Sequence, residues 1–183
     1  YENYFSDEGY FALALFHKDI SNWIFDGNYE IDMSGVADPS TGQIPDTSTG
    51  TGSGKVNGGD GSLRGYEVSA TLPLNIFSEQ LDGFGIIASY TGVKSDMEDQ
   101  NGNEFKLPGL SESISTMTFY YESNGFSARA SMRNRGDFKG DVYGLGFDTV
   151  QVDILGETIW DAQLGFDFAE AGYKDLAGLS IFL

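Results

Sequence analysis

Three arginines, Arg129, Arg133 and Arg135, lie an even number of residues apart in the segment that follows Asn124-Gly125. Guanidinium groups offer several fixed donors, so they bind carboxylates, phosphates and hydroxyl-rich solutes. The residues between them are small or apolar: Ala128, Ala130 and Met132. A period of two is that of a β-strand, so the arginines are expected on one face and the apolar residues on the other.

Two interpretations of these arginines follow from the charge of the chain. They form a basic track that attracts an anionic or hydroxyl-rich solute, or they pair across strands with interior carboxylates such as Glu67, Asp161 and Asp167, or with a plug. We favour pairing, because the formal net charge is −18 and many acidic partners are available.

The segment around Asn124-Gly125 is predicted to be a tight hairpin. Asn-Gly suits a two-residue type I′ turn, which needs a positive φ at both central positions. Arginines placed in hydrocarbon would cost about 2 to 4 kcal/mol each near mid-bilayer. The apolar face is therefore the covered one, and alternation alone leaves open whether another sheet or lipid covers it.

The composition excludes several classes of protein. The 183 residues include no cysteine, which excludes disulfides and thiolate metal sites. Ten basic against 28 acidic residues argue against nucleic-acid binding. The sequence has no run of about 18 apolar residues and no secretory signal pattern, so neither a transmembrane helix nor a signal peptide is expected. Abundant glycine, scarce proline and the absence of helical periodicity predict an all-β chain.

Catalysis and cofactor binding find little support in the sequence. His17 is the single histidine, and no nucleophile motif accompanies it, so we expect a strand-surface or interfacial position for it and no enzyme activity. The stretch DMEDQNGNE (96–104) offers oxygen ligands, yet it departs from the EF-hand spacing. Solvated turn residues are the favoured interpretation and a calcium site is the alternative. No cofactor and no metal site is predicted.

Strand candidates alternate with short and long connections in a strict order. The strands are predicted within 9–24, 63–74, 84–95, 116–121, 126–135, 158–168 and 176–183, with a stub at 1–5. The long connections run at about 25–62, 96–110 and 136–157, and the short ones at 6–9, 75–83, 122–125 and 169–175. Short turns at one end and long loops at the other are typical of a transmembrane β-barrel. A soluble Greek-key sandwich gives no reason for this alternation.

Aromatic residues gather where a membrane interface would lie. Beside the short turns stand Tyr10, Phe84, Tyr121 and Phe126, whereas Trp23 and Trp160 stand where strands meet long loops. We interpret them as two interfacial girdles. The alternative is that aromatic residues are common in strands of any kind.

The long connection between 38 and 62 is rich in Gly, Ser and Thr and is expected to be flexible. Tyr29 lies near its base. Its ring either stacks on a sugar or packs against a neighbouring loop. Loops on a rigid scaffold are where ligand contacts usually occur.

Several segments resemble the later barrel strands of TonB-dependent outer-membrane receptors. The resemblance lies in FALALFHKDISNWI, RGYEVSATLPLNIFSEQLDGFGIIASYTGVKSD, LPGLSESISTMTFYYESNGFSARASMRNRGDF and AGLSIFL, and it covers residues 1–183 apart from the long loops. They look closest to a large proteobacterial subgroup often associated with carbohydrate uptake. Members of the family have an N-terminal plug with a TonB-interacting box and a barrel of about 22 strands.

The resemblance implies an antiparallel up-and-down meander that forms an arc of a larger barrel, of about seven to eight strands. No segment matches the plug or its box, and Leu183 is not the terminal aromatic residue of the family. We therefore expect an internal piece of a barrel, with TonB reached through a plug outside this chain.

The function that this resemblance implies is active uptake across the bacterial outer membrane. Outer-membrane lipid and a small solute are the expected partners, with carbohydrate favoured and an iron-siderophore second. Candidate ligand contacts are Arg129, Arg133, Arg135, Glu67 and Tyr29. The rival hypothesis is a soluble, secreted carbohydrate-binding β-sandwich, which predicts that Leu13, Val68, Met132 and Leu164 are sealed beneath a second layer.

Overall fold

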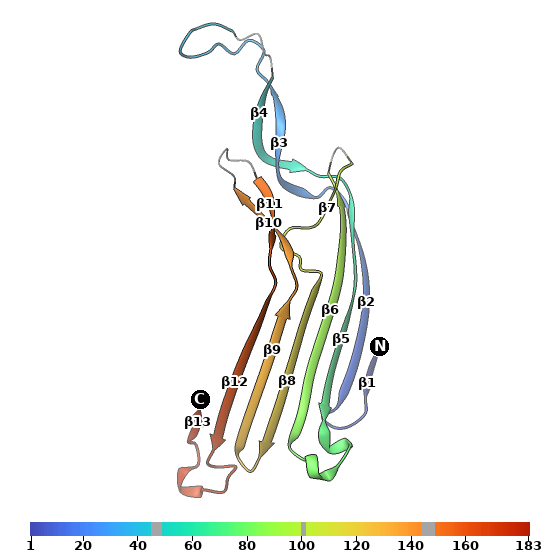
Figure 1. The fold of residues 1–183 in the computed structure, drawn as a ribbon, viewed down its shortest axis with the longest axis vertical. Helices are drawn as coiled ribbons and strands as arrows, with labels where there is room; N and C mark the ends of the chain where they lie inside the picture. Colours follow the sequence, from blue (N-terminus) through green and yellow to red (C-terminus); the bar gives the residue numbers. More distant parts are fainter. Residues whose placement is uncertain (45–48, 100–101, 144–148) are drawn as a thin grey trace.

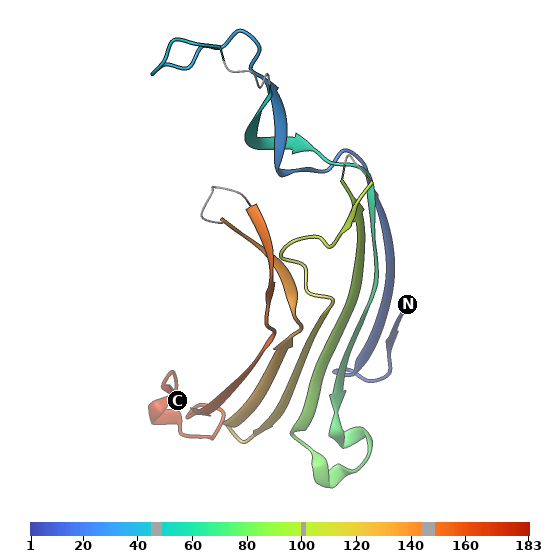
Figure 2. The same ribbon diagram turned by 45° about the horizontal axis from the view of Figure 1, so that its top comes forward.

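One antiparallel sheet dominates the structure, a computed structural model that describes residues 1–44, 49–99, 102–143 and 149–183 (Figure 1). Its strands follow one another as β1 (Glu2–Tyr4), β2 (Tyr10–Ile20), β5 (Gly61–Pro73), β6 (Phe84–Glu98), β8 (Ser113–Ser123), β9 (Phe126–Arg135), β12 (Glu157–Asp167) and β13 (Ser180–Phe182). A short strand, β7 (Glu104–Phe105), pairs with β6. The first and last strands of this order do not pair with each other, so the sheet is an open meander that bends into an arc (Figure 2). The all-β, up-and-down arc expected from the sequence is confirmed.

Two of the long connections carry hairpins of their own. β3 (Ile24–Asp32) pairs with β4 (Thr49–Asn57), and β10 (Phe138–Tyr143) pairs with β11 (Thr149–Ile154). Both hairpins lie at the end of the sheet opposite the short turns (Figure 1). The expectation of a flexible segment throughout 38–62 is therefore wrong for 49–57, which forms β4. Glycines weaken strands on their own, but here Tyr29 covers Gly52 and Gly54 of the facing strand.

The short connections hold small 3₁₀ helices at Leu74–Ile76, Glu79–Leu81 and Lys174–Leu176. The last of these corrects the predicted strand at 176–183, of which only Ser180–Phe182 is a strand. Asp167 explains the difference, because its carboxylate accepts bonds from the Glu170 amide at 2.9 Å and the Ser180 hydroxyl at 2.8 Å and so holds a wider turn. None of the described helices has the length and apolar character needed to cross a membrane.

The hairpin between β8 and β9 forms at the predicted Asn124-Gly125. Both residues have positive φ, +48° and +79°, and Ser123 pairs with Phe126 across the turn. A side chain at Gly125 would also collide with the carbonyl of Asp167 in the neighbouring turn. The turn therefore requires glycine both for its backbone conformation and for its close packing.

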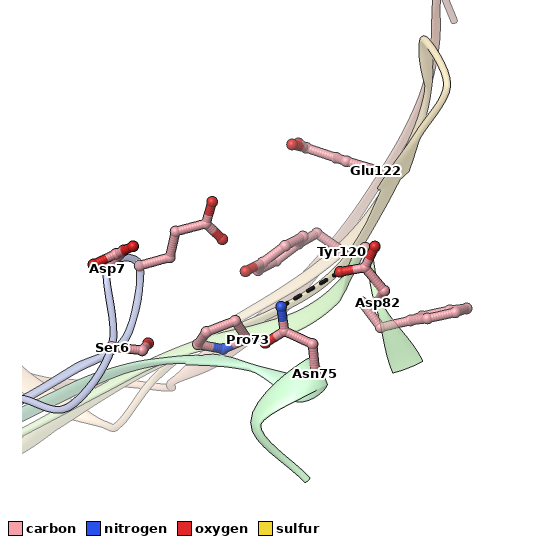
Figure 3. A pocket seen from close by; sticks show the side chains of 10 residues that line it. Ser6, Asp7, Pro73, Asn75, Asp82, Tyr120 and Glu122 are labelled. Atoms are coloured by element: carbon pink, nitrogen blue, oxygen red, sulfur yellow. Dashed lines mark hydrogen bonds between the residues drawn. The ribbon is translucent and has the colours of Figure 1, made fainter. Parts of the chain in front are cut away.

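The strand register separates two kinds of side chain onto two faces. One row across six strands is apolar and runs through Phe11, Ala70, Ala88, Met117, Met132 and Trp160. The row one residue away points to the other face and runs through Ala12, Ser69, Ser89, Thr116, Arg133 and Ile159. Tyr120 and Glu122, which belong to the second face, project into the hollow of the curved sheet (Figure 3). The concave face is thus polar and the convex face apolar.

No second layer covers the convex face within the described ranges. Leu13, Val68 and Met132 are half-buried, whereas Leu164 is 49% exposed. Among described residues, Met97 is the buried hydrophobic side chain. The sandwich hypothesis required these apolar residues to be sealed in a core, so it is wrong. Close packing instead occurs within the sheet, where the Tyr120 ring lies over Gly85 and the Tyr66 ring over Gly92.

Candidate functional site

The middle of the concave face carries a band of hydroxyl groups around Arg133. Ser89 Oγ lies 2.7 Å from Thr116 Oγ1, and Thr118 Oγ1 lies 2.9 Å from Ser131 Oγ. Thr116 is directly opposite Arg133 in the register. The Arg133 side chain is exposed and makes no ion pair or hydrogen bond with the described residues. Its guanidinium therefore presents free donors beside a hydroxyl surface.

Arg129 pairs with a carboxylate, as the favoured interpretation of the arginines predicted. Its Nη2 donates to Glu122 Oε1 at 2.6 Å, across the β8–β9 hairpin. Both side chains are about half exposed, at 53% and 49%. The positive charge of Arg129 is thus largely matched near the short-turn end of the concave face.

Arg135 has a structural role at the other end of β9. Its Nε donates to Ser111 Oγ at 2.7 Å and its Nη2 to the carbonyl of Gly109 at 2.8 Å. The guanidinium carbon also lies 3.8 Å from the centre of the Phe138 ring, which is a cation–π distance. These contacts fasten the connection before β8 to the sheet, so Arg135 is occupied by loop anchoring.

Glu67 lies on the concave face but apart from the arginines. It shares a register row with Thr91, Ile114 and Arg135. Three strand spacings of about 4.8 Å separate Glu67 from Arg135 in that row, which is too far for an ion pair. No pair is recorded between Glu67 and any described residue. The sequence thus assigned Glu67 to the correct face but to no observed partner.

A hollow of about 430 Å³ opens on the concave side at the short-turn end (Figure 3). Two connections contribute carboxylates to it, Asp7 and Glu8 from the first and Asp82 from the second, and the end of β8 contributes Glu122. Asn75 Nδ2 donates to Asp82 Oδ1 at 3.4 Å. Sequence reasoning missed this acidic hollow, although each short turn carries an acidic residue. Only the strand register shows that these two turns and the end of β8 lie side by side.

The aromatic residues near the short turns form a continuous band on the convex face. The rings of Phe84 and Tyr121 are 4.3 Å apart between centroids, and Tyr121 and Phe126 are 6.1 Å apart. Trp160, 68% exposed, lies on the same face toward the long loops. Their common placement is what a membrane girdle requires, while the girdle itself stays a prediction.

Two aromatic residues depart from that arrangement. Tyr10 lies opposite Thr71, on the concave face, and so stands apart from the convex band. Trp23 follows the end of β2, and its indole Nε1 is buried without a hydrogen-bond partner. It lines a hollow of about 400 Å³ between the loops, together with residues such as Asp141 and Gln151. Tyr10 differs from the prediction because it alternates onto the concave face of β2. Trp23 differs because β2 ends at Ile20, so Trp23 lies in the loop beyond the strand.

The loops hold the remaining predicted contacts. Tyr29 in β3 packs over the glycines of β4, and 46% of its surface remains exposed. In the acidic segment 96–104, the Asp99 carboxylate accepts bonds from the amide and side-chain nitrogens of Asn103, both at 2.8 Å. Residues 100 and 101 of this segment fall outside the described ranges. Within those ranges, no group of three or more His, Cys, Asp or Glu side chains is placed to hold a metal ion.

The family model described as "TonB dependent receptor-like, beta-barrel" matches residues 1–183. The chain belongs to this family. A receptor barrel explains the segregated faces of the sheet, because such barrels turn apolar side chains outward and polar ones toward the lumen. The family is one of bacterial outer-membrane transport receptors rather than enzymes.

Two solved structures of receptors share the fold of this TonB-dependent receptor chain. The FpvAI–pyocin S2 complex superposes with a TM-score of 0.57 at 14% identity, covering 91% of this chain and 20% of that chain. The ferric-catecholate import receptor Fiu from K12 E. coli, in its closed form, superposes with a TM-score of 0.55 at 21% identity, covering 88% and 19%. The chain thus spans about a fifth of each structure. Among curated proteins, none matches the chain by sequence.

Proposed function

We propose that this chain forms part of the wall of an outer-membrane receptor that takes up a scarce solute with energy supplied through TonB. The observation that carries the proposal is the open arc with an apolar convex face and a polar concave face, in a chain of the TonB-dependent receptor family. The convex face contacts lipid and the concave face lines the lumen. The plug that couples to TonB lies outside these residues.

The extracellular side is the end with the long connections. There the hairpins β3–β4 and β10–β11 extend beyond the main sheet and contribute to solute capture. The short-turn end, with its acidic hollow, faces the periplasm. Its carboxylates suit basic groups of a plug seated in the lumen.

Carbohydrate is the favoured solute. Arg133 and the neighbouring hydroxyl groups of Ser89, Thr116 and Ser131 can exchange hydrogen bonds with sugar hydroxyls. The net charge of −18 creates a field that repels anionic solutes and leaves neutral ones unaffected. Ferric siderophore is the second candidate, because Fiu is a ferric-catecholate import receptor with the same barrel fold.

The test is uptake by the full-length receptor expressed in outer membranes of a host that lacks its own related receptors. Labelled malto-, xylo- and chito-oligosaccharides are compared with a ferric catecholate, with and without TonB. We expect TonB-dependent oligosaccharide uptake, reduced about tenfold by Arg133→Ala, in line with the loss of charged hydrogen bonds. Arg129→Ala is the matched control, because that arginine is already paired with Glu122.

The two parts of the proposal fail in different ways. Uptake of the ferric catecholate without any oligosaccharide would replace the solute class and keep the transport function. Accumulation that is equal with and without TonB would overturn energised transport itself.

A further inference from the structure

A row of basic residues crosses three strands on the convex face, where that face meets the long-loop end. His17 of β2 is directly opposite Arg64 of β5, and Arg64 is directly opposite Lys94 of β6. Like charges in directly opposed positions destabilise a sheet unless an anion lies between them. Elsewhere on the convex face of the described main strands, the rows toward the short turns are apolar or uncharged, so this row stands out in an acidic chain.

The acidic residues that pair with this row lie on its loop side, away from the apolar residues of the sheet. The next row toward the loops holds Asp19, Ser62 and Asp96. Asp19 pairs with His17 at 2.9 Å, and Asp96 with Arg64 at 3.0 Å. Both partners of the Arg64 pair are more than half exposed, so the pair is weak and its guanidinium is free to exchange partners. No ion pair is recorded between Lys94 and the described residues.

A groove of about 590 Å³ lies beside these basic residues. Arg64 and Lys94 line one part of it, and Leu15, Tyr66 and Tyr90 line the apolar part. Glu112 also lines the groove, and its carboxylate is paired with Lys106 at 3.1 Å. The two tyrosine rings stack at 5.8 Å, and Gly92 provides space because it has no side chain. Leu15 is 78% exposed. The groove is therefore amphipathic, with cations toward the loops and apolar surface toward mid-sheet.

We propose that this groove binds the phosphorylated headgroup of an outer-leaflet lipid. The phosphate lies between Arg64 and Lys94, and the acyl chains run over Leu15, Tyr66 and Tyr90 toward the middle of the membrane. The order of side chains along the strands, apolar, then basic, then acidic, matches a lipid whose phosphate lies just above its hydrocarbon. The inference rests on the membrane orientation in the proposed function, and it adds a specific lipid site on the outside of the barrel.

The test uses the full-length receptor in phosphatidylcholine nanodiscs with bisphosphorylated lipid A as the probe. Native mass spectrometry and phosphate analysis report the lipid A retained as its concentration is lowered. The double variant Arg64→Gln/Lys94→Gln is expected to weaken retention about tenfold or more, as two charged phosphate contacts are lost. Lys18→Gln is the matched control, because Lys18 lies at the same level of β2 on the concave face and should leave retention unchanged.

Separate measurements keep the proposal falsifiable. The slower electrophoretic migration of the barrel after heating checks that each variant is folded. Equal retention by the double variant and the native receptor would overturn the proposal, as would equal retention of dephosphorylated lipid A. A receptor dimer that the double variant abolishes would assign the groove to a second copy instead. Solute uptake, measured in parallel, tests the transport proposal independently of the lipid result.

Discussion

Arg129 and Glu122 form an ion pair of 2.6 Å across the β8–β9 hairpin, on the concave face of the sheet. Because both side chains are about half exposed, we expect a coupling energy of no more than about 1 kcal/mol. A double-mutant cycle with Arg129→Ala and Glu122→Ala, measured by guanidinium unfolding of the full receptor in lipid, gives this value. A coupling of several kcal/mol would mean that the pair is desolvated in the complete barrel.

Arg133 and Arg135 should differ in their effect on loop order. Arg135→Lys removes the two-pronged contact with Ser111 and Gly109, so amide hydrogen exchange at 107–112 should become faster. Arg133→Lys is the control and should leave exchange there unchanged. Equal acceleration by both variants would show that Arg135 does not anchor this segment.

A side chain at position 85 should destabilise the barrel, because the ring of Tyr120 lies over Gly85. A Cβ at Gly85 would collide with the ring of Tyr120, so Gly85→Val should destabilise the barrel by about 1 to 3 kcal/mol. Tyr120→Ala, made in the Gly85→Val background, should recover part of that loss by removing the collision. Unfolding midpoints of the single and double variants measure the effect. Without recovery, backbone conformation rather than the ring would be the reason for glycine.

The two faces of β9 should respond oppositely to a new charge. Ala130→Arg places a cation on the convex face near the middle of the apolar band and should cost about 2 to 4 kcal/mol in a bilayer. Ser131→Arg, one residue away on the concave face, should cost much less. The unfolding free energy of the full receptor in lipid vesicles compares the two. Equal costs would contradict the assignment of the convex face to lipid.

The turn at Asp38 should stay formed at lower pH than a turn held by an aspartate of ordinary pKa. The hydroxyl and the amide of Ser40 donate to its carboxylate at 2.5 and 2.7 Å, and these bonds hold the pKa of Asp38 below its usual value. A lowered pKa means that the turn is stabilised above the ordinary aspartate pKa and loses that stabilisation as the pH falls through the lowered one. Chemical shifts of Ser40 and Thr41 in a pH titration check this. A midpoint at or above the ordinary value would contradict it.

Local sequence signals identified the parts of the fold that depend on neighbouring residues. Asn124-Gly125 predicted the turn, because two successive positive φ angles favour those residues. The alternation of Ala128 and Met132 with arginines predicted the two faces. The flexible interpretation of 49–57 was wrong, because its glycines are covered by the ring of Tyr29, which comes from the paired strand β3 and lies more than twenty residues away in the sequence.

The partners of the arginines show the same difference between local and long-range contacts. Arg129 and Glu122 lie on strands joined by a two-residue turn, and Glu122 is opposite Ser127, two residues from Arg129, so their pairing follows from the hairpin register. Arg135 contacts Gly109 and Ser111 through a loop whose path local periodicity does not determine. Glu67 was a reasonable partner by charge, yet three strand spacings keep it from Arg135.

The sequence alone determined that this chain is a set of two-faced β-strands joined by alternating short and long connections, because side-chain alternation and turn chemistry are local properties. The tertiary structure decided which strands are neighbours and in what register. That register created the acidic hollow from two separate turns and the end of β8, and it aligned His17, Arg64 and Lys94 in one row. The register is set by the backbone hydrogen-bond ladder between strands. This ladder brings together residues that are far apart in the chain, so their contacts cannot be seen in the local sequence pattern.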